Sequence, residues 1–595
     1  MKRFFPAAVP INPTRRRFMQ GLIGVCVSGG AAMRWTPALG QTAATSPAVL
    51  TGTEFTLDIS ETPVNFTGRP RMATTVNGQI PGPTLRWREG DEITLRVTNR
   101  MRHSTSIHWH GILLPFRMDG VPGISFDGIA PGATFVYRFK VKQSGTYWYH
   151  SHSHFQEQTG LYGPIVIDPR EPQTHQHERD YVVMLSDWSD ENPDMIYRHL
   201  KQASDYYNYV RPTAGDFIEE ARHGGFKKAW ESRAMWDKMR MSPRDLSDVS
   251  GATYTFLTNG ATPAANWSGL FRPGEKVRLR FINGSASTFF DVRIPGLKMT
   301  VIAADGQDVE PVAIDEFRIG VAETYDVIVA PTEDRAYTIF SQAIDRSGYA
   351  RATLAPRPGM QAEIPALDPV PTLTMADMGM GDMGKGDMAG MGDMGKGDMA
   401  GMGASGSQQS HAMHASAAGD TVAVKDHAAA EFGPGNSMRA DGVSTRLDDP
   451  GPGLRGNGRK VLTYADLHTM GGPIDAREPA REIVLHLTGN MDRFMWSFNG
   501  RKYAEAEPIL FHYGERLRIV LINDTMMNHP IHLHGMWSEL ESADGNFQVR
   551  KHTITVQPGH RVSYRVTADA PGRWAYHCHL LYHMEAGMFR AIVVE

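Results

Sequence analysis

Cysteine is almost absent from this chain of 595 residues, which contains only Cys26 and Cys578. Cys26 lies in an N-terminal stretch that we expect to be removed. The remaining chain therefore cannot form an internal disulfide, even in a compartment that permits one. Cys578 lies in the stretch HCHLLYHMEAGM (residues 577–588), between two histidines and shortly before a third histidine and a methionine. This setting makes Cys578 a candidate metal ligand, although a lone buried cysteine is more often a small core residue.

The chain also lacks a strong net charge and any basic block beyond its N-terminal leader. The formal net charge is −4 at pH 7, which argues against a nucleic-acid partner. A hydrophobic content of 41% with 21% charged residues is typical of a globular protein. Because 60 glycines and 37 prolines place turns throughout the chain, many short strands are favoured over long helices.

Residues 1–40 have the pattern of a signal peptide. The stretch TRRRFMQ (residues 14–20) precedes a short apolar run, and the small residues ALG (residues 38–40) follow it. The run is too short for a transmembrane helix, so no stable membrane span is expected. The adjacent arginines resemble a twin-arginine signal, which predicts export to the periplasm by the twin-arginine machinery. An ordinary secretory leader or a membrane anchor is the alternative.

The rest of the chain repeats itself. PTLRWREGDEITLRVTNRMRHSTSIHWHG (residues 83–111) and PILFHYGERLRIVLINDTMMNHPIHLHG (residues 508–535) both alternate apolar and polar residues, pass an Asn and end in His-x-His-Gly. RPGEKVRLRFINGSASTFFDVRI (residues 272–294) has the same pattern without histidines. Later segments (residues 135–167, 325–342 and 562–594) repeat in the same way. This repetition predicts three related all-β units built as sandwiches or barrels.

The predicted organisation has three units and one linker. Each unit begins and ends with a recurring strand pair, and the middle unit, which has neither histidine set, is expected to be a spacer. We predict units at residues 50–170, 175–365 and 456–595, a helical insert at about 195–245 and a Met- and Gly-rich linker at 370–455. The tryptophans and methionines of the insert (Trp230, Met235, Trp236, Met239 and Met241) are expected to pack rather than to bind metal.

Counting from the shared Asn divides the histidines into two classes. Asn523 plus six, nine and eleven residues reaches His529, His532 and His534, whereas the same steps from Asn99 reach Thr105, His108 and His110. From Asn283 the steps reach Phe289, Val292 and Ile294. Eight histidines thus occur as matched His-x-His pairs in the first and third units (His108, His110, His150, His152, His532, His534, His577 and His579). Four residues are unique to the third unit (His529, Cys578, His583 and Met588), and the first unit has Ser151 and Leu161 where the third has Cys578 and Met588.

The two classes predict two metal centres. Residues i and i+2 of a strand point to the same side, so four His-x-His pairs can surround a multi-metal cluster at an interface between units. Imidazole alone does not name the metal. Two histidines, one cysteine and a more distant methionine are the ligand set of a blue-copper electron-transfer site. Cys578 would bind that copper while its neighbours bind the cluster, so it would connect the two centres covalently.

These motifs resemble those of the multicopper oxidases. HWHG (108–111), HSH (150–152), HPIHLHG (529–535) and HCHLLYHMEAGM (577–588) look like the four copper motifs of that family, in order and over nearly the whole chain after the leader. The leader and the methionine tract look most like the bacterial periplasmic copper-resistance oxidases of the CopA/PcoA type. The resemblance implies three cupredoxin-like Greek-key barrels.

The resemblance also implies four copper ions and their ligands. One type 1 copper would take His529, Cys578, His583 and Met588, and one type 2 copper would take His108 and His532. Two type 3 coppers would take His110, His150, His152, His534, His577 and His579. The implied chemistry is one-electron oxidation of Cu(I) or a small reductant at type 1, and reduction of O₂ to water at the cluster.

Reduction of O₂ consumes protons, so acids are expected near the cluster. Asp119 in MDGVPG matches the family's first-domain acid. The family's second acid directly follows the third type 1 ligand, where this chain has Met584, so Glu585 is the substitute that we predict. His154 extends the motif HSHSH but is expected to lie outside the ligand set.

A methionine tract separates the second and third units. Nine of the 28 residues at 375–402 are methionine, within a direct repeat of GDMGKGDMAGM. Dense glycine predicts a flexible segment, and thioethers favour Cu(I), so copper capture competes with an inert linker as its interpretation. HAMH (411–414) adds possible Cu(II) ligands. The predicted Cu(I) contacts are Asp524, Met526 and Met527 near type 1, and Met383, Met388, Met391, Met394, Met399 and Met402 in the tract.

Three functions are therefore compared. The first is a periplasmic cuprous oxidase, a partner of other periplasmic copper-resistance proteins. The second is a laccase-like oxidase of phenols or other organic reductants, which a methionine-covered type 1 site would hinder. The third is a copper-sequestering protein without enzymatic activity, although storage does not need a cysteine that joins two centres.

Overall fold

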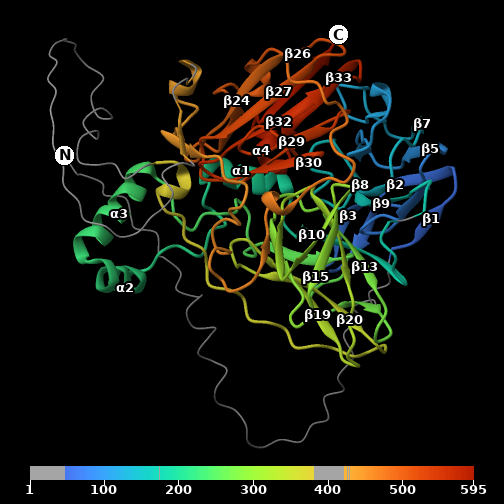
Figure 1. The fold of residues 1–595 in the computed structure, drawn as a ribbon, viewed down its shortest axis with the longest axis horizontal. Coiled ribbons are helices and arrows are strands. Elements are labelled where there is room, and N and C mark those ends of the chain that lie inside the picture. Colours follow the sequence, from blue (N-terminus) through green and yellow to red (C-terminus); the bar gives the residue numbers. More distant parts are fainter. Residues whose placement is uncertain (1–46, 173, 381–420, 425–426, 428) are drawn as a thin grey trace, which may run out of the picture. The chain divides into compact units, whose positions relative to one another are not determined.

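The computed structural model describes residues 47–172, 174–380, 421–424, 427 and 429–595. The predicted leader, the tract methionines from Met383 to Met402 and the HAMH motif lie outside these residues. Among the described helices, none is long and apolar enough to cross a membrane. The chain is mostly β, as the density of turns predicts. Apart from one two-stranded hairpin, the described strands form three two-sheet units (Figure 1).

The first unit pairs a four-stranded sheet with a five-stranded sheet. The four-stranded sheet has the order β3 (Arg71–Val76), β2 (Glu54–Val64), β5 (Glu92–Asn99) and β7 (Thr134–Lys140). The five-stranded sheet has the order β1 (Val49–Thr51), β4 (Thr84–Arg88), β9 (Tyr162–Asp168), β8 (Gly145–His150) and β6 (His108–His110). A single 3-10 turn, η1 (Phe116–Met118), precedes Asp119.

The second unit has two six-stranded sheets. One has the order β11 (Tyr254–Thr258), β10 (Arg179–Ser189), β13 (Val277–Asn283), β18 (Thr324–Val329), β15 (Met299–Ala304) and β16 (Gln307–Ile314). The other has the order β12 (Trp267–Leu270), β20 (Tyr349–Ala355), β19 (Tyr337–Ala343), β14 (Phe290–Arg293), β17 (Glu316–Ile319) and β23 (Val461–Leu462). The last strand comes from the chain after the linker, so residues 461–462 extend a sheet of the second unit.

The third unit, drawn in orange and red in Figure 1, repeats the arrangement once more. Its first sheet has the order β25 (Met495–Phe498), β24 (Arg481–Asn490), β27 (Arg516–Asn523), β32 (Arg561–Thr567), β29 (Ser538–Glu541) and β30 (Phe547–Lys551). Its second sheet has the order β26 (Ile509–Phe511), β34 (Phe589–Val594), β33 (Gly572–Cys578), β28 (His529–Leu533) and β31 (Thr553–Val556). The short helix α4 (Leu581–Glu585) connects β33 to β34, and the 3-10 turns η4 (Tyr464–Asp466) and η5 (Tyr503–Glu505) lie in loops.

The three units share one pattern of strand pairing. In each, a long first strand pairs in parallel with the strand that carries the shared Asn, as in β2–β5, β10–β13 and β24–β27. On its other side in the sheet, the strand with the shared Asn pairs antiparallel with a later strand, as in β5–β7, β13–β18 and β27–β32. Apolar side chains from the strands are buried in a continuous core. The prediction of three related cupredoxin-like β-units is confirmed.

Helices occur within the second unit, after β10. They are α1 (Pro193–Gln202), α2 (Ala214–Gly224) and α3 (Phe226–Met239). Asn192 caps α1 by accepting from the backbone N–H of Asp194, and Thr213 caps α2. Trp236 is buried whereas Trp230 is 62% exposed, and Met239 and Met241 pack against the core. The insert also touches the third unit: Lys201 Nζ donates to the carbonyl of Phe494 at 2.7 Å, and Arg240 pairs with Asp492 at 2.9 Å.

Both described ends of the predicted linker pack onto the third unit. At the start of the tract, η2 (Ala376–Met378) buries Met378, the backbone of residues 377–379 lies against Gly559, and Gly379 accepts from the N–H of Gly442. After it, β21 (Thr421–Ala423) and β22 (Gly442–Ser444) form a hairpin around η3 (Ala429–Phe432). A small apolar cluster joins this segment to β27 (Val424, Ala440, Val443, Val520 and Ile522).

Candidate metal centres

The strand register places the paired histidines and the ligands unique to the third unit on opposite faces of one sheet. In the antiparallel pair β28–β33, His532 lies opposite His577 and Ile531 lies opposite Cys578. Residues opposite each other share a face, and consecutive residues alternate, so His532 and His577 face one side while Cys578 faces the other. His529 precedes Ile531 by two residues and therefore shares the face of Cys578. One sheet thus serves two centres.

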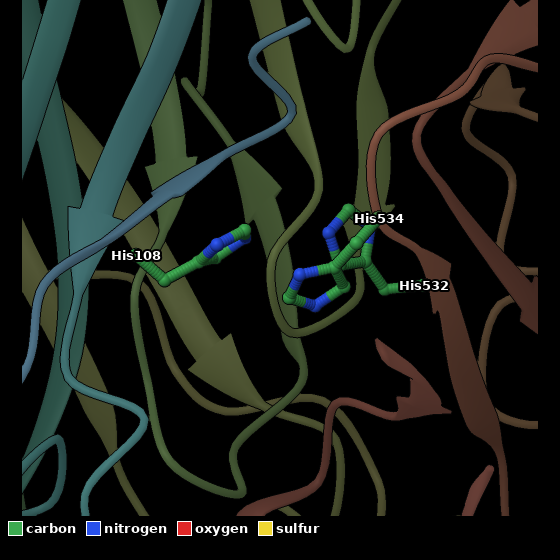
Figure 2. A group of neighbouring side chains, drawn as sticks. All are labelled: His108, His532 and His534. Atoms are coloured by element: carbon green, nitrogen blue, oxygen red, sulfur yellow. The ribbon is translucent and has the colours of Figure 1, made fainter. Parts of the chain in front are cut away.

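The eight paired histidines meet where the first and third units face each other. Figure 2 shows His108 of β6 directed toward His532 and His534 of the third unit. His108 stacks on His534 with ring centroids 4.0 Å apart, and His110 stacks on His532 at 3.8 Å. Two further pairs cross the same interface: His150 with His579 at 4.8 Å and His152 with His577 at 5.0 Å. The predicted grouping of all eight is therefore found in the structure.

Within this histidine cluster, ring nitrogens converge in threes. His110, His150 and His579 have one ligand nitrogen each within 4.8 Å of the others, and so do His152, His534 and His577. His108 and His532 form a third such group together with His534. In two of these groups Nε2 atoms lie close enough for one ion to bind both: those of His150 and His579 are 3.3 Å apart, and those of His534 and His577 are 3.1 Å apart.

The imidazoles are held in fixed orientations. His108 Nδ1 bonds to the carbonyl of Asp119 at 2.7 Å, and His532 Nδ1 bonds to the carbonyl of His552 at 2.6 Å. In both rings Nε2 is buried without a hydrogen-bond partner among the described residues. Such an anchored ring with one free nitrogen is typical of a metal ligand.

The cluster also favours neutral rings. Burial, followed by the neighbouring imidazoles, holds the pKa of His110, His150, His152, His532, His534 and His579 well below the usual value. Burial lowers the pKa of His577 to about 4. Neutral imidazoles keep a lone pair, so the cluster can accept metal ions near neutral pH without first losing protons.

The second centre brings together the residues unique to the third unit. Cys578 Sγ lies 3.6 Å from His529 Nδ1 and 3.8 Å from His583 Nδ1, and the two nitrogens are 3.2 Å apart. Ligand atoms at about 2.0–2.3 Å from one ion, with angles of about 100–120° between them, are separated by roughly 3–4 Å, so these three atoms fit a single ion. Met588 is fully buried, and its carbonyl accepts from the N–H of Cys578 at 3.1 Å.

Outer residues fix the two imidazoles of this centre. Thr525 Oγ1 lies 2.7 Å from His529 Nε2, and Asp248 Oδ2 lies 2.7 Å from His583 Nε2. Trp496 stacks on His583 with ring centroids 3.9 Å apart. All three ligand side chains and Asp248 are at most 1% exposed. Burial raises the pKa of Asp248 to about 8.

Two buried acids contact the histidine cluster. Asp119, predicted from the sequence, has Oδ2 at 2.9 Å from His534 Nδ1 and Oδ1 at 3.3 Å from His108 Nδ1. Glu157, which was not predicted, has Oε2 at 2.6 Å from His150 Nδ1, and its Oε1 has no hydrogen-bond partner among the described residues. Burial, followed by the charge of Asp187, raises the pKa of Glu157 well above its usual range.

Glu585 lies elsewhere. It is exposed at the end of α4, where its charge acts on Tyr197 and Lys201. An exposed carboxylate on the outer side of α4 is badly placed to serve buried histidines, so the structure does not support the choice of Glu585. The sequence pattern places an acid just after His583, but in the structure α4 presents residue 585 on its exposed side. The chain segment after His154 instead places Glu157 in the interior.

The remaining predicted residues have varied surroundings. His154 is largely exposed and pairs with Asp194 at 2.8 Å, outside the cluster. Met526 and Met527, which shortly precede His529 in the sequence, are both buried. Asp524 is also buried, and its Oδ2 lies 2.7 Å from His486 Nδ1. Sequence reasoning missed His552, whose Nδ1 lies 3.1 Å from His110 Nε2. No motif marks His552, Glu157 or Asp248, because each reaches its contact only through the tertiary fold.

Comparisons with known proteins agree with this arrangement. Residues 58–172, 179–358 and 476–595 each match a family model described as multicopper oxidase. The chain therefore belongs to the multicopper oxidase family, which is an oxidase family that uses copper and O₂. The prediction of an oxidase of this family is confirmed.

Relatives and solved structures are similar over almost the full length. The copper resistance protein A homolog of Pseudomonas syringae pv. tomato is 58% identical, and the match covers 99% of this chain and all of the relative. Copper resistance protein A of Escherichia coli is also 58% identical, over 98% of this chain and all of the relative. The structure of Fet3p, a multicopper oxidase that functions in iron import, has a TM-score of 0.62 at 19% identity and covers 91% of this chain and 90% of its own. At that identity the likeness shows the fold alone.

Proposed function

We propose that this protein is a periplasmic cuprous oxidase of copper resistance, which oxidises Cu(I) to Cu(II) and reduces O₂ to water. Full-length similarity to proteins named copper resistance protein A supports the role in resistance. The leader residues 1–40 support twin-arginine export, and other periplasmic copper-resistance proteins would be its partners. The geometry of the two centres supports the chemistry.

The copper ligands are proposed residue by residue. The type 1 site is His529, Cys578, His583 and Met588, whose Sγ and Nδ1 atoms converge. The type 2 site is His108 and His532, whose Nε2 atoms have no hydrogen-bond partner in the part of the chain that the structure describes. The two type 3 sites are His110, His150 and His579, and His152, His534 and His577. Together these four ions supply one-electron oxidation of the substrate and four-electron reduction of O₂ when bound.

Cys578 connects the centres through the backbone. Its side chain belongs to the type 1 site, while its neighbours His577 and His579 belong to two different type 3 sites. His577 Nδ1 also bonds to the carbonyl of Cys578 at 3.0 Å. The two centres are therefore joined by a few covalent bonds and one hydrogen bond, so that an electron can pass between them without a jump through space.

Asp119 and Glu157 are the proposed proton-holding residues. Both are buried, both touch cluster imidazoles, and each has one carboxylate oxygen free of hydrogen-bond partners among the described residues. Burial favours the protonated form of Glu157 by raising its pKa. A carboxyl beside the cluster can deliver a proton to negative charge that develops there. Glu157 thereby takes the role that the sequence pattern suggests for Glu585.

The observation that favours Cu(I) over a phenol is the burial of the whole type 1 site. His583 has no exposed surface, and Asp248 Oδ2 lies 2.7 Å from its Nε2. The insert contacts the third unit through Lys201, which donates to the carbonyl of Phe494, and the Phe494 ring lies 6.0 Å from that of His583. A flat aromatic ring cannot reach His583 directly, whereas a small cation can be held by carboxylate and thioether groups.

Oxygen consumption tests this function. Copper-loaded protein is given Cu(I), stabilised by a weak ligand, or 2,6-dimethoxyphenol in parallel, and O₂ uptake is recorded. We expect Cu(I) to be oxidised with at least about tenfold higher kcat/KM than the phenol. A preference for the phenol would favour the laccase-like alternative. Absence of uptake from either substrate, with many Cu(I) ions bound, would favour sequestration.

A further inference from the structure

A second group of buried metal-binding side chains lies on the third unit, outside both proposed centres. His427 Nδ1 lies 2.8 Å from Glu431 Oε2, and His486 Nδ1 lies 2.7 Å from Asp524 Oδ2. The two pairs face each other: Glu431 Oε2 is 3.7 Å from His486 Nδ1, and His427 Nδ1 is 4.0 Å from Asp524 Oδ2. We call these four residues the His–carboxylate cluster.

Two parts of the chain build this cluster. His486 lies in β24 and Asp524 directly follows β27, so both belong to the framework of the third unit. His427 and Glu431 come from the segment after the methionine tract, which docks on β27 through Val424, Ala440 and Val443. Further bonds fasten the segment, because the N–H of Ala440 donates to Asp524 Oδ1 at 3.0 Å and Ser437 bonds to Gly489. The rings of His427 and His486 are thus fixed 5.0 Å apart.

Burial makes the cluster costly without a cation. The side chains of Glu431, Asp524 and His486 are at most 4% exposed, and that of His427 is 12% exposed. Glu431 Oε1 has no hydrogen-bond partner among the described residues. Two buried carboxylates require a compensating charge, from protonated imidazoles or from a metal ion.

We propose that the His–carboxylate cluster is a metal site for a divalent transition-metal ion, bound through two imidazole nitrogens and two carboxylate oxygens. This N₂O₂ donor set contains no thiolate or thioether, so it suits Cu(II) better than Cu(I). That the resident ion is Cu(II) rests on the proposed function, whereas the binding of a divalent ion does not. The donor set differs from the sulfur-containing type 1 site and from the all-histidine cluster.

In the sequence, a residue of the His–carboxylate cluster directly precedes a residue that contacts the type 1 centre. Asp524 belongs to the His–carboxylate cluster, and the next residue, Thr525, contacts His529 Nε2 at 2.7 Å. An ion here also ties the segment after the methionine tract to the catalytic unit. The site is therefore placed to capture Cu(II) formed beside it and to hold that segment in position.

Copper counting by equilibrium dialysis tests the site independently of oxidase activity. Full-length protein with its blue centre loaded is dialysed against Cu(II), and a second series uses Zn(II). We expect wild-type protein to retain about one more Cu(II) ion per chain than the double variant Glu431→Gln/His486→Gln. The additional ion should give an electron paramagnetic resonance signal with nitrogen couplings from two imidazoles. Blue absorption shows that the variant has folded.

A matched control replaces an exposed pair on the same unit, His512 and Glu507, by Gln and should keep the wild-type count. The single variant His427→Gln, at the edge of the cluster, should bind the additional ion at least about tenfold more weakly. Equal copper counts and spectra in wild type and a blue double variant would overturn the proposal. If the double variant is not blue, wild-type affinity in His427→Gln would overturn it instead. Neither result would bear on O₂ uptake.

Discussion

The middle and third units have the same framework but different contents. In the third unit Asn523 Nδ2 donates to the carbonyls of Met527 and Val556, at 2.7 and 3.0 Å. In the middle unit Asn283 Nδ2 donates to the carbonyls of Thr288 and Ile319, at 2.8 and 3.1 Å. Asn99 makes the same kind of bonds in the first unit. The Asn therefore shapes the same turn in each unit, whatever the turn carries.

The residues after this turn differ completely between the two units. Where the third unit has His529, His532 and His534, the middle unit buries Phe289, Val292 and Ile294 in its apolar core. The framework therefore does not depend on metal, and the ligands are placed on strands that fold for other reasons. Exchanging residues between equivalent positions of the units therefore separates the effect of the ligands from the effect of the framework.

The largest effect is expected when the third unit receives a residue of the middle unit. His532→Val introduces the side chain of Val292 and removes a cluster nitrogen that has no other partner among the described residues. We expect O₂ uptake to fall by about 10³-fold or more, because several kcal/mol of metal-dependent catalysis are lost. Blue absorption should remain, since His529, Cys578 and His583 are on the opposite face. Loss of the blue band together with activity would contradict the separation of the two faces.

Removing a proton-holding acid should have the next largest effect. Asp119→Asn keeps the shape and most hydrogen bonds near His534 but cannot release a proton. Turnover should fall by about 10²-fold with the KM for Cu(I) unchanged, as steady-state O₂ uptake would show. Glu585→Gln is the matched control, and its turnover should stay within about twofold of wild type. A stronger effect of Glu585→Gln than of Asp119→Asn would restore the prediction made from the sequence.

The shared Asn provides a prediction about stability alone. Asn283→Ala removes two buried hydrogen bonds in the unit without ligands and leaves two carbonyls unpaired. It should lower the free energy of unfolding by about 2–3 kcal/mol, measured by the midpoint of urea unfolding, while each folded molecule keeps its copper and its activity. Asn523→Ala should cost a similar amount and in addition shift the blue band, because Met527 lies two residues before His529. Equal spectra in both variants would contradict the local role of Asn523.

The smallest effect is expected from Met588→Leu, which introduces the residue that the first unit has at Leu161. The thioether is the weak axial ligand of the proposed type 1 site, so the blue band should persist. The rate of Cu(I) oxidation should change by less than about tenfold. Loss of the blue copper would show that Met588 holds the ion as strongly as the histidines do.

The ligands could be predicted from the sequence because strand geometry converts spacing into direction. His-x-His pairs on paired strands must share a face, and Cys578 between two histidines must point away from them. The residues around the ligands could not be predicted in this way. Asp248 reaches His583 from the second unit, and Glu431 reaches His486 from the segment after the tract. Such contacts depend on how loops dock, which local pattern does not specify.

Cys578→Ser, which introduces the first unit's Ser151 at the equivalent position, tests the central claim most directly. Copper content, blue absorption and O₂ uptake with Cu(I) are measured on the same sample. We predict that the variant loses the blue band and about one copper ion per chain, keeps the copper of the histidine cluster, and consumes O₂ at least about 10³-fold more slowly. Undiminished O₂ uptake without the blue band would contradict the account, because electrons would then reach the histidine cluster without Cys578.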